Sequence, residues 1–146
     1  MIFNWILINK LAIGTPLTSE RDKIFLEDNK IKGILDLRNQ FDLSKINFDY
    51  EELLDKKFKY INFGLPDHNS KRFATKDEIK DALDILEELL KNGPVYMHCH
   101  AAVERCPLIS VAFLKKNKQL SLIQSYEYVK QQNNSTNILM GQLLNI

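Results

Sequence analysis

The chain has 146 residues, of which 45% are hydrophobic and 27% are charged. This size and composition are ordinary for one globular domain, so we expect residues 1–146 to form a single domain around one core. Twenty basic and nineteen acidic residues leave a formal net charge of +1. A balance so near neutrality gives no electrostatic reason to expect a nucleic-acid partner or an anionic membrane surface.

Three further classes of protein are disfavoured. The apolar run at residues 3–8 is short, is interrupted by Asn4 and has no basic leader or cleavage site, so we expect neither a signal peptide nor a membrane span. Two cysteines are too few for a disulfide framework, which favours the cytoplasm. His98, Cys99 and His100 are consecutive and lack the paired spacing of zinc ligands, so we expect no metal and no cofactor.

The first half of the chain predicts strands interleaved with helices. The pattern predicts strands at residues 5–8 and 11–14, a helix at 19–29 and strands at 31–36 and 60–63. Residues 64–69, rich in Gly, Pro and Asn, are expected to form a loop. A helix then begins at Thr75, which forms a capping box with Glu78, and stops at Asn92-Gly93. Its apolar stripe is expected to be core.

The second half predicts one more strand and then helices alone. The strand covers residues 95–97, and helices follow at 107–117, 121–132 and 136–144, with a polar loop at 131–137. We therefore expect an α/β fold with a central, mostly parallel sheet of about four to five strands, flanked by helices, and a helical carboxyl-terminal third. A ligand site is expected beyond the carboxyl ends of the strands.

The segment between the strand at 95–97 and the helix at 107–117 carries the strongest chemical signal. Cys99 and Arg105 lie six positions apart in it. If this loop curls around the start of the helix, its backbone N–H groups and the helix dipole favour an anion there. The same donors would stabilise a Cys99 thiolate, and the guanidinium of Arg105 suits bidentate contact with phosphate. The segment predicts a phosphate site with its own nucleophile.

A thiolate that attacks a phosphate ester needs a proton donor for the leaving oxygen. Asp67 is the best candidate, because it lies 32 residues before Cys99 in a loop that also follows a strand. Asp36, at a strand end, and Asp77, in the first turn of a helix, are weaker rivals.

The stretch resembles the His-Cys-x5-Arg signature of the cysteine-dependent protein tyrosine phosphatases, particularly the small dual-specificity branch. The resemblance implies a metal-independent phosphomonoester hydrolase that forms a cysteinyl-phosphate and acts on a phosphorylated substrate, with a phosphoprotein as the leading candidate. It also implies that Asp67 is the general acid and that His98 orders the loop and supports the thiolate. The phosphate-binding residues would be His100, Ala101, Ala102, Val103, Glu104 and Arg105.

Two positions depart from the usual family pattern. Ala102 replaces a glycine, so its methyl group restricts the loop backbone. Cys106 replaces a hydroxyl residue, and a thiol is a weaker donor, so the phosphoenzyme should hydrolyse slowly. Cys106 packs in the core or, alternatively, forms a reversible disulfide with an oxidised Cys99.

Other interpretations remain open at this point: a phosphate-binding pseudophosphatase, a rhodanese-like sulfur transferase and a purely structural domain. His100 and Glu104 are expected to point outward. Neither is a lysine or an arginine, and Glu104 would repel additional phosphate groups, so a polyphosphoinositide headgroup is disfavoured as a substrate. Lys71 and Arg72 are candidates for the rim of a shallow pocket. The sequence does not predict the oligomeric state.

Overall fold

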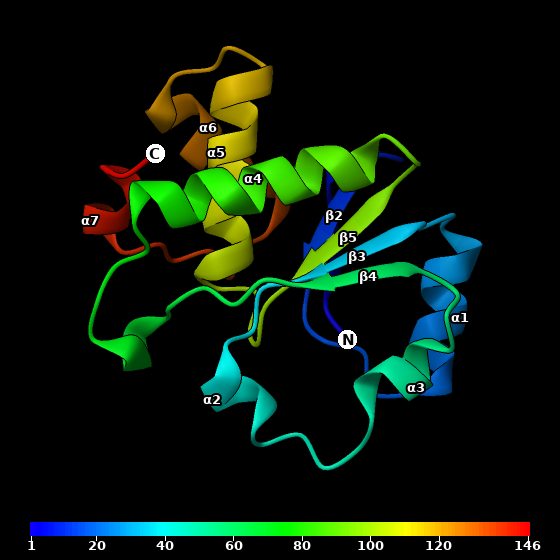
Figure 1. The fold of residues 1–146 in the computed structure, drawn as a ribbon. Helices are drawn as coiled ribbons and strands as arrows, with labels where there is room; N and C mark the ends of the chain where they lie inside the picture. The colour runs from blue at the N-terminus through cyan, green and yellow to red at the C-terminus, as the bar shows by residue number, and fades with distance from the viewer.

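The computed structural model describes residues 1–146. A five-stranded sheet lies at its centre, in the order β1-β2-β5-β3-β4 (Figure 1). β1 pairs antiparallel with β2, and the other neighbouring strands are parallel, which confirms the mostly parallel sheet. The strands are β1 (Phe3–Leu7), β2 (Leu11–Gly14), β3 (Gly33–Asp36), β4 (Lys59–Asn62) and β5 (Val95–His98).

Helices cover both faces of this sheet. Figure 1 shows the long helix α4 with α5 and α6 on one side, and α1 with α3 on the other. The helices are α1 (Glu20–Asp28), α2 (Gln40–Leu43), α3 (Tyr50–Leu54), α4 (Lys76–Leu90), α5 (Arg105–Asn117), α6 (Leu122–Gln132) and α7 (Met140–Leu143), with the short 3-10 helix η1 (His68–Ser70).

Side chains at the helix starts explain why the longer helices were predictable. Ser19 accepts a hydrogen bond from the N–H of Asp22 at the start of α1. Thr75 and Glu78 form the predicted capping box of α4, and Ser121 forms one with Gln124 at α6. Each cap satisfies N–H groups that have no partner inside the helix.

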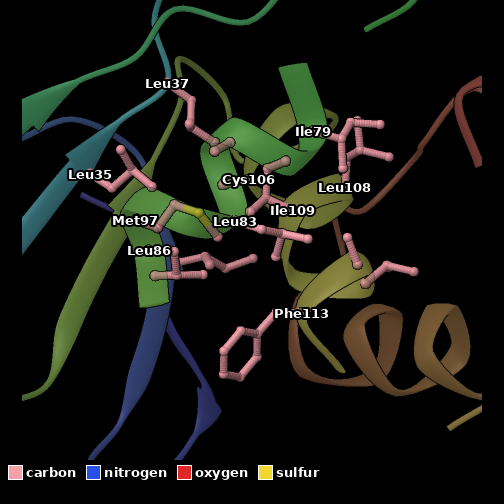
Figure 2. Packing of buried hydrophobic residues seen from close by; sticks show 14 of the residues in the cluster. Leu35, Leu37, Ile79, Leu83, Leu86, Met97, Cys106, Leu108, Ile109 and Phe113 are labelled. Atoms are coloured by element: carbon pink, nitrogen blue, oxygen red, sulfur yellow. The ribbon is translucent and has the colours of Figure 1, made fainter. Parts of the chain in front are cut away.

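The alternation of side chains along each strand builds two cores. Leu35 and Met97 face α4 and α5, where they belong to the larger cluster shown in Figure 2. Their neighbours Ile34 and Tyr96 face the opposite way, into a smaller cluster with residues of α1 and α3. Since successive strand residues point to opposite faces, His98 is expected on the same face as Tyr96.

Three parts of the chain differ from the predicted elements. The helix predicted at 136–144 is wrong except for the four residues of α7. The N–H of Asn137 donates to the carbonyl of Val103 instead of to a helical partner. The short helices α2 and α3 fall at residues for which no element was predicted. β1 begins at Phe3 and has an irregular register between Trp5 and Leu7.

No helix is both long and apolar enough to traverse a lipid bilayer.

Candidate active site

The site lies where the parallel strands end. In the register of the sheet, His98 is level with Gly14 on β2 and with Asp36 on β3. The loops that follow β3, β4 and β5 therefore leave the same edge, as expected for a ligand site of this fold. The structure brings Cys99, Arg105 and Asp67 together at this edge.

The loop after β5 leads directly into helix α5, which begins at Arg105 rather than at the predicted Pro107. Glu104 occupies the N-cap position, but its side chain makes no capping hydrogen bond. The N–H groups of His100, Ala101 and Val103 donate to no backbone carbonyl. Free donors gathered at a helix N-terminus favour an anion, so this loop stays the candidate phosphate site.

The carbonyl groups of this loop are bonded to the carboxyl-terminal segment. The side chains of Asn133 and Ser135 both donate to the carbonyl of Ala102, at 2.8 and 2.9 Å. The N–H of Asn137 donates to the carbonyl of Val103 at 2.9 Å. The polar stretch at 131–137 is therefore more than the simple loop that the sequence predicted, because it holds the backbone of the candidate phosphate site.

Ala102 adopts the backbone conformation that its position in the loop demands. Its φ is 58°, in the left-handed region that favours glycine, and the residue is fully buried. An alanine in this region costs about 1 kcal/mol. The two hydrogen bonds to its carbonyl help to hold it there.

Cys99 is buried, and its pKa is lowered to about 6. The largest cause is the hydrogen bond between its sulfur and that of Cys106, 3.4 Å away; burial opposes the shift, and nearby N–H groups and Arg105 add to it. A thiol with this pKa is mostly thiolate at neutral pH, which is the nucleophilic form.

Cys106 keeps its own proton. Burial is the main reason why its pKa is raised well above the usual value, and the neighbouring Cys99 raises it further. Its sulfur also lies 3.8 Å from the carbonyl oxygen of Gly14. Both cysteines are free, so Cys106 acts in this structure as a thiol donor to the sulfur of Cys99.

Arg105 is buried between two carboxylates. Its Nη1 lies 2.6 Å from Oδ2 of Asp42, and its Nη2 lies 3.6 Å from Oδ2 of Asp67. Burial would lower the pKa of Arg105, but the hydrogen bond to Asp42 and the nearby negative charges raise it. Asp42 was missed by the sequence analysis because it belongs to α2, whose four residues give no periodic signal.

The two carboxylate oxygens of Asp67 have different surroundings: one faces the site, and the other accepts hydrogen bonds within its own loop. Its Oδ1 accepts hydrogen bonds from the N–H of Asn69 and the hydroxyl of Ser70, because Asp67 caps η1. Its Oδ2 is the atom near Arg105. The carboxyl group is therefore fixed in direction, with Oδ2 toward Arg105.

The rival carboxylates are engaged elsewhere. Asp36 is fully buried and forms an ion pair with Arg38 at 2.8 Å. Burial would raise the pKa of Asp36, but Arg38 and the hydroxyl of Tyr60 hold it below its ordinary value. Asp77 lies in the first turn of α4.

His98 is fully buried and its pKa is lowered to about 4, mainly by burial. Its Nδ1 lies 3.3 Å from the carbonyl oxygen of Cys99, and its Nε2 lies 3.0 Å from the hydroxyl of Tyr50. The N–H of Leu17 donates to that same hydroxyl oxygen. A neutral imidazole with its proton on Nδ1 satisfies all three contacts. Tyr50, on α3, was also missed from the sequence.

The expectation that Glu104 points outward is wrong. Its side chain is only 12% exposed, so it does not point outward. Its Oε2 accepts hydrogen bonds from the backbone N–H of His68 at 3.2 Å and from His68 Nδ1 at 3.1 Å. The bond to Glu104 is also the main reason why the pKa of His68 is raised. His100 is exposed, as expected.

A pocket of about 500 Å³ is lined by Cys99, Arg105, Asp67, Asp42 and Glu104. Phe41 and Lys45 of the α2 region and Leu139 also line it. Lys71 and Arg72 do not, and Arg72 pairs with Glu78 of α4 instead, so the expected rim role is wrong. No group of three or more His, Cys, Asp or Glu side chains is placed to hold a metal ion.

Comparison with solved structures identifies the same fold. PTPMT1 in complex with PI(5)P superposes with a TM-score of 0.82 at 13% identity, covering 98% of this chain and 90% of that one. A human tyrosine phosphatase-like serine/threonine/tyrosine-interacting protein gives a TM-score of 0.80 at 16% identity, covering 98% and 91%. At these identities the likeness concerns the fold alone.

Sequence relatives add the family. Dual specificity protein phosphatase 5 of Rattus norvegicus is 36% identical over 84 residues, which are 55% of this chain but only 22% of the relative. The chain thus spans about a fifth of the length of that relative. The family model "Dual specificity phosphatase, catalytic domain" matches residues 16–146, and this chain belongs to that family of cysteine-based phosphatase domains.

Proposed function

We propose that residues 1–146 form one catalytic domain that hydrolyses phosphomonoesters through a cysteinyl-phosphate. The observation that carries the proposal is the placement of Cys99, with its pKa lowered to about 6, in the loop that leads to Arg105 and faces Asp67. A nucleophile, a clamp and an acid then meet at one anion site. Family membership and this geometry favour phosphatase chemistry over sulfur transfer.

In the first step the Cys99 thiolate attacks phosphorus in line with the departing oxygen. Arg105 and the free N–H groups of residues 100–105 stabilise the equatorial oxygens. Asp67 donates a proton from Oδ2 to the leaving oxygen as the phosphorus–oxygen bond breaks. The arginine and the amides supply the positive field for this step.

In the second step a water molecule attacks the cysteinyl-phosphate. Asp67, now a carboxylate, accepts a proton from that water, and the phosphorus–sulfur bond breaks. The thiol of Cys106 donates to the departing Cys99 sulfur, which it already contacts at 3.4 Å. Because a thiol is a weaker donor than a hydroxyl, this step should limit the rate.

The charges around the pocket favour a phosphoprotein over a polyphosphorylated headgroup. Asp42, Asp67 and Glu104 line the pocket together with Arg105 and Lys45, so the lining carries no excess of permanent cations for extra phosphates. A thiolate nucleophile needs a reducing environment, so we place this activity in the cytoplasm.

The test is turnover of p-nitrophenyl phosphate and of a phosphotyrosine peptide in the presence of a chelator. We expect a rapid burst of product followed by slower steady turnover, and complete loss of both in Cys99→Ser. Substantial activity in Cys99→Ser would overturn the mechanism. PI(5)P vesicles serve as the competing substrate, and we expect slower turnover of them than of the peptide.

A second candidate is a pseudophosphatase that binds phosphate without turning it over. It is favoured by the left-handed Ala102 and by a thiol at position 106, both of which depart from the usual family pattern. Saturable phosphate binding with no burst of product would select this candidate.

A further inference from the structure

The loop that carries Asp67 contacts the phosphate loop through Arg105, which lies 3.6 Å from Asp67 and 3.5 Å from the carbonyl oxygen of Leu65, and through Glu104. Glu104, inside the phosphate loop, accepts two hydrogen bonds on Oε2 from His68, the residue after Asp67. These are the only hydrogen bonds that residues 66–71 form with any other part of the chain; their remaining hydrogen bonds are local. This contact therefore helps to fix the position of the segment over the site, together with the ion pair between Arg105 and Asp67.

The side chain of Glu104 is used outside its own helix. The N-cap residues that accept N–H groups from the first turn of a helix are chiefly Ser, Thr, Asp and Asn. Glu104 makes no such cap, and its largely buried side chain turns away from α5 toward His68. Two consequences follow: the side chain of Glu104 occupies none of the N–H groups at the start of α5, and a largely buried carboxylate receives its hydrogen bonds from His68 alone.

The direction of the Asp67 carboxyl group follows from the placement of the loop. Oδ1 of Asp67 is held inside the loop by Asn69 and Ser70, so the carboxyl group moves with the loop as one body. Oδ2 lies 3.6 Å from Arg105, near the reacting phosphate. A shift of the loop by about 1 Å would take this oxygen out of hydrogen-bond reach of a leaving group.

The charges near His68 support a stable contact. Glu104 faces it from the phosphate loop, Asp67 lies beside it, and Arg105 is the one nearby cation. The hydrogen bond to Glu104 raises the pKa of His68, so the imidazolium form that donates from Nδ1 persists to higher pH than for a free histidine.

We propose that Glu104 and His68 form a latch that sets the position from which Asp67 delivers its proton to the leaving group. Both are positioning residues, because neither touches the reacting atoms in the proposed mechanism. The inference rests on the proposed phosphatase function and adds a specific role to a variable position of the phosphate loop.

The experiment compares two esters that differ in their need for an acid. Phenyl phosphate has a poor leaving group that requires a proton, whereas dinitrophenyl phosphate has a leaving group that departs unprotonated. We expect Glu104→Ala, which removes both hydrogen bonds, to lower kcat/KM for phenyl phosphate by about two- to tenfold. His68→Ala keeps the bond from the backbone N–H and should cause a smaller loss, and both variants should leave dinitrophenyl phosphate nearly unchanged. Asp67→Asn should show the same selectivity with a larger loss.

A double-mutant cycle then tests whether Glu104 acts on the rate through Asp67. In the Asp67→Asn background, Glu104→Ala should have no further effect on phenyl phosphate, because there is no proton left to position. Glu104→Gln keeps an acceptor oxygen and should recover part of the rate. The matched control is Glu127→Ala, which removes an exposed carboxylate on α6.

Different results would contradict the positioning role of Glu104 and His68 and the proposed phosphatase function. Equal losses on both esters in Glu104→Ala and His68→Ala, or an added loss in the Asp67→Asn background, would overturn the latch while leaving the phosphatase function intact. His68 has a side chain that is 67% exposed, so His68→Ala is the variant least able to disturb folding. A wild-type protein that hydrolyses neither ester overturns the proposed function, and the latch with it.

Discussion

Oδ2 of Asp42 lies 2.6 Å from Nη1 of Arg105, across 63 positions of the chain. The same oxygen accepts a hydrogen bond from the N–H of Asn39 at 3.0 Å, so one atom both caps the helix α2 and holds the guanidinium. Both charged side chains are less than a tenth exposed. The short helix α2 therefore sets the orientation of the group proposed to bind phosphate.

Asp42→Asn should weaken phosphate binding. Without the carboxylate, Arg105 loses its shorter ion pair and its fixed direction, so we expect KM to rise and kcat/KM to fall about tenfold, which corresponds to about 1.4 kcal/mol. Steady-state kinetics on p-nitrophenyl phosphate measure this effect. Asp49→Asn is the control, because Asp49 is the N-cap of the short helix α3 and does not contact Arg105. Identical kinetics in the two variants would contradict the role of Asp42.

The pH dependence of the nucleophile should depend on Cys106. As the pH falls through about 6, Cys99 takes up a proton and loses its nucleophilicity, so alkylation by iodoacetate should slow on the acid side of that value. Because the bond from Cys106 is the largest cause of the low pKa, Cys106→Ala should move the midpoint to higher pH. Cys106→Ser keeps a donor and should retain a low midpoint. A midpoint that is the same in all three proteins would refute this dependence.

The carboxyl-terminal segment should stabilise the phosphate loop. Asn133 is fully buried and donates to the Ala102 carbonyl and to Thr136, while its Oδ1 accepts from Asn4. Asn133→Ala leaves these partners unsatisfied, and we expect the free energy of unfolding to fall by about 2 kcal/mol. Urea denaturation measures the change. The neighbouring Asn134 is exposed, and Asn134→Ala should be nearly neutral; equal effects of the two substitutions would argue against the contact.

Treatment with hydrogen peroxide should produce a disulfide between Cys99 and Cys106. Hydrogen peroxide oxidises the Cys99 thiolate to a sulfenic acid, and the Cys106 thiol then displaces water from it to form a disulfide. The sulfurs already lie 3.4 Å apart, so only a small movement of the loop is needed. Mass spectrometry of the intact protein should detect the loss of two hydrogens, reversed by dithiothreitol. Cys106→Ser should instead proceed to irreversible oxidation of Cys99, and failure of the wild-type protein to form the bridge would leave Cys106 with packing and donation alone.

The sequence was sufficient to predict a helix or strand wherever the residues that specify it are close together in the chain. Thr75 and Glu78 predicted the start of α4 because a capping box needs only four consecutive positions. The strand and helix around Cys99 were predicted in the same way, from an apolar run, a turn and a proline. The helix predicted at residues 136–144 was largely wrong, since the N–H of Asn137 donates to the carbonyl of Val103 and not to a helical partner.

Only some residues of the candidate site could be predicted from the sequence. Cys99 and Arg105 share one loop, and Asp67 follows a parallel strand, so the sheet edge brings them together. Asp42 and Tyr50 belong to helices of four and five residues, which are too short for an apolar period to be read. The direction of Glu104 could not be predicted at all, because its partner lies in a different loop.

The sequence by itself determined the α/β fold and predicted the candidate phosphate loop with Cys99 and Arg105, because these depend on consecutive residues and on the period of apolar side chains. Only the tertiary structure decided what holds that loop in place: Asp42 on the guanidinium, Cys106 on the thiolate, Asn133 on the carbonyl of Ala102, and Glu104 on His68. Most of these contacts join residues far apart in the chain. They form only once the sheet has brought its loops to a common edge, so no local pattern encodes them.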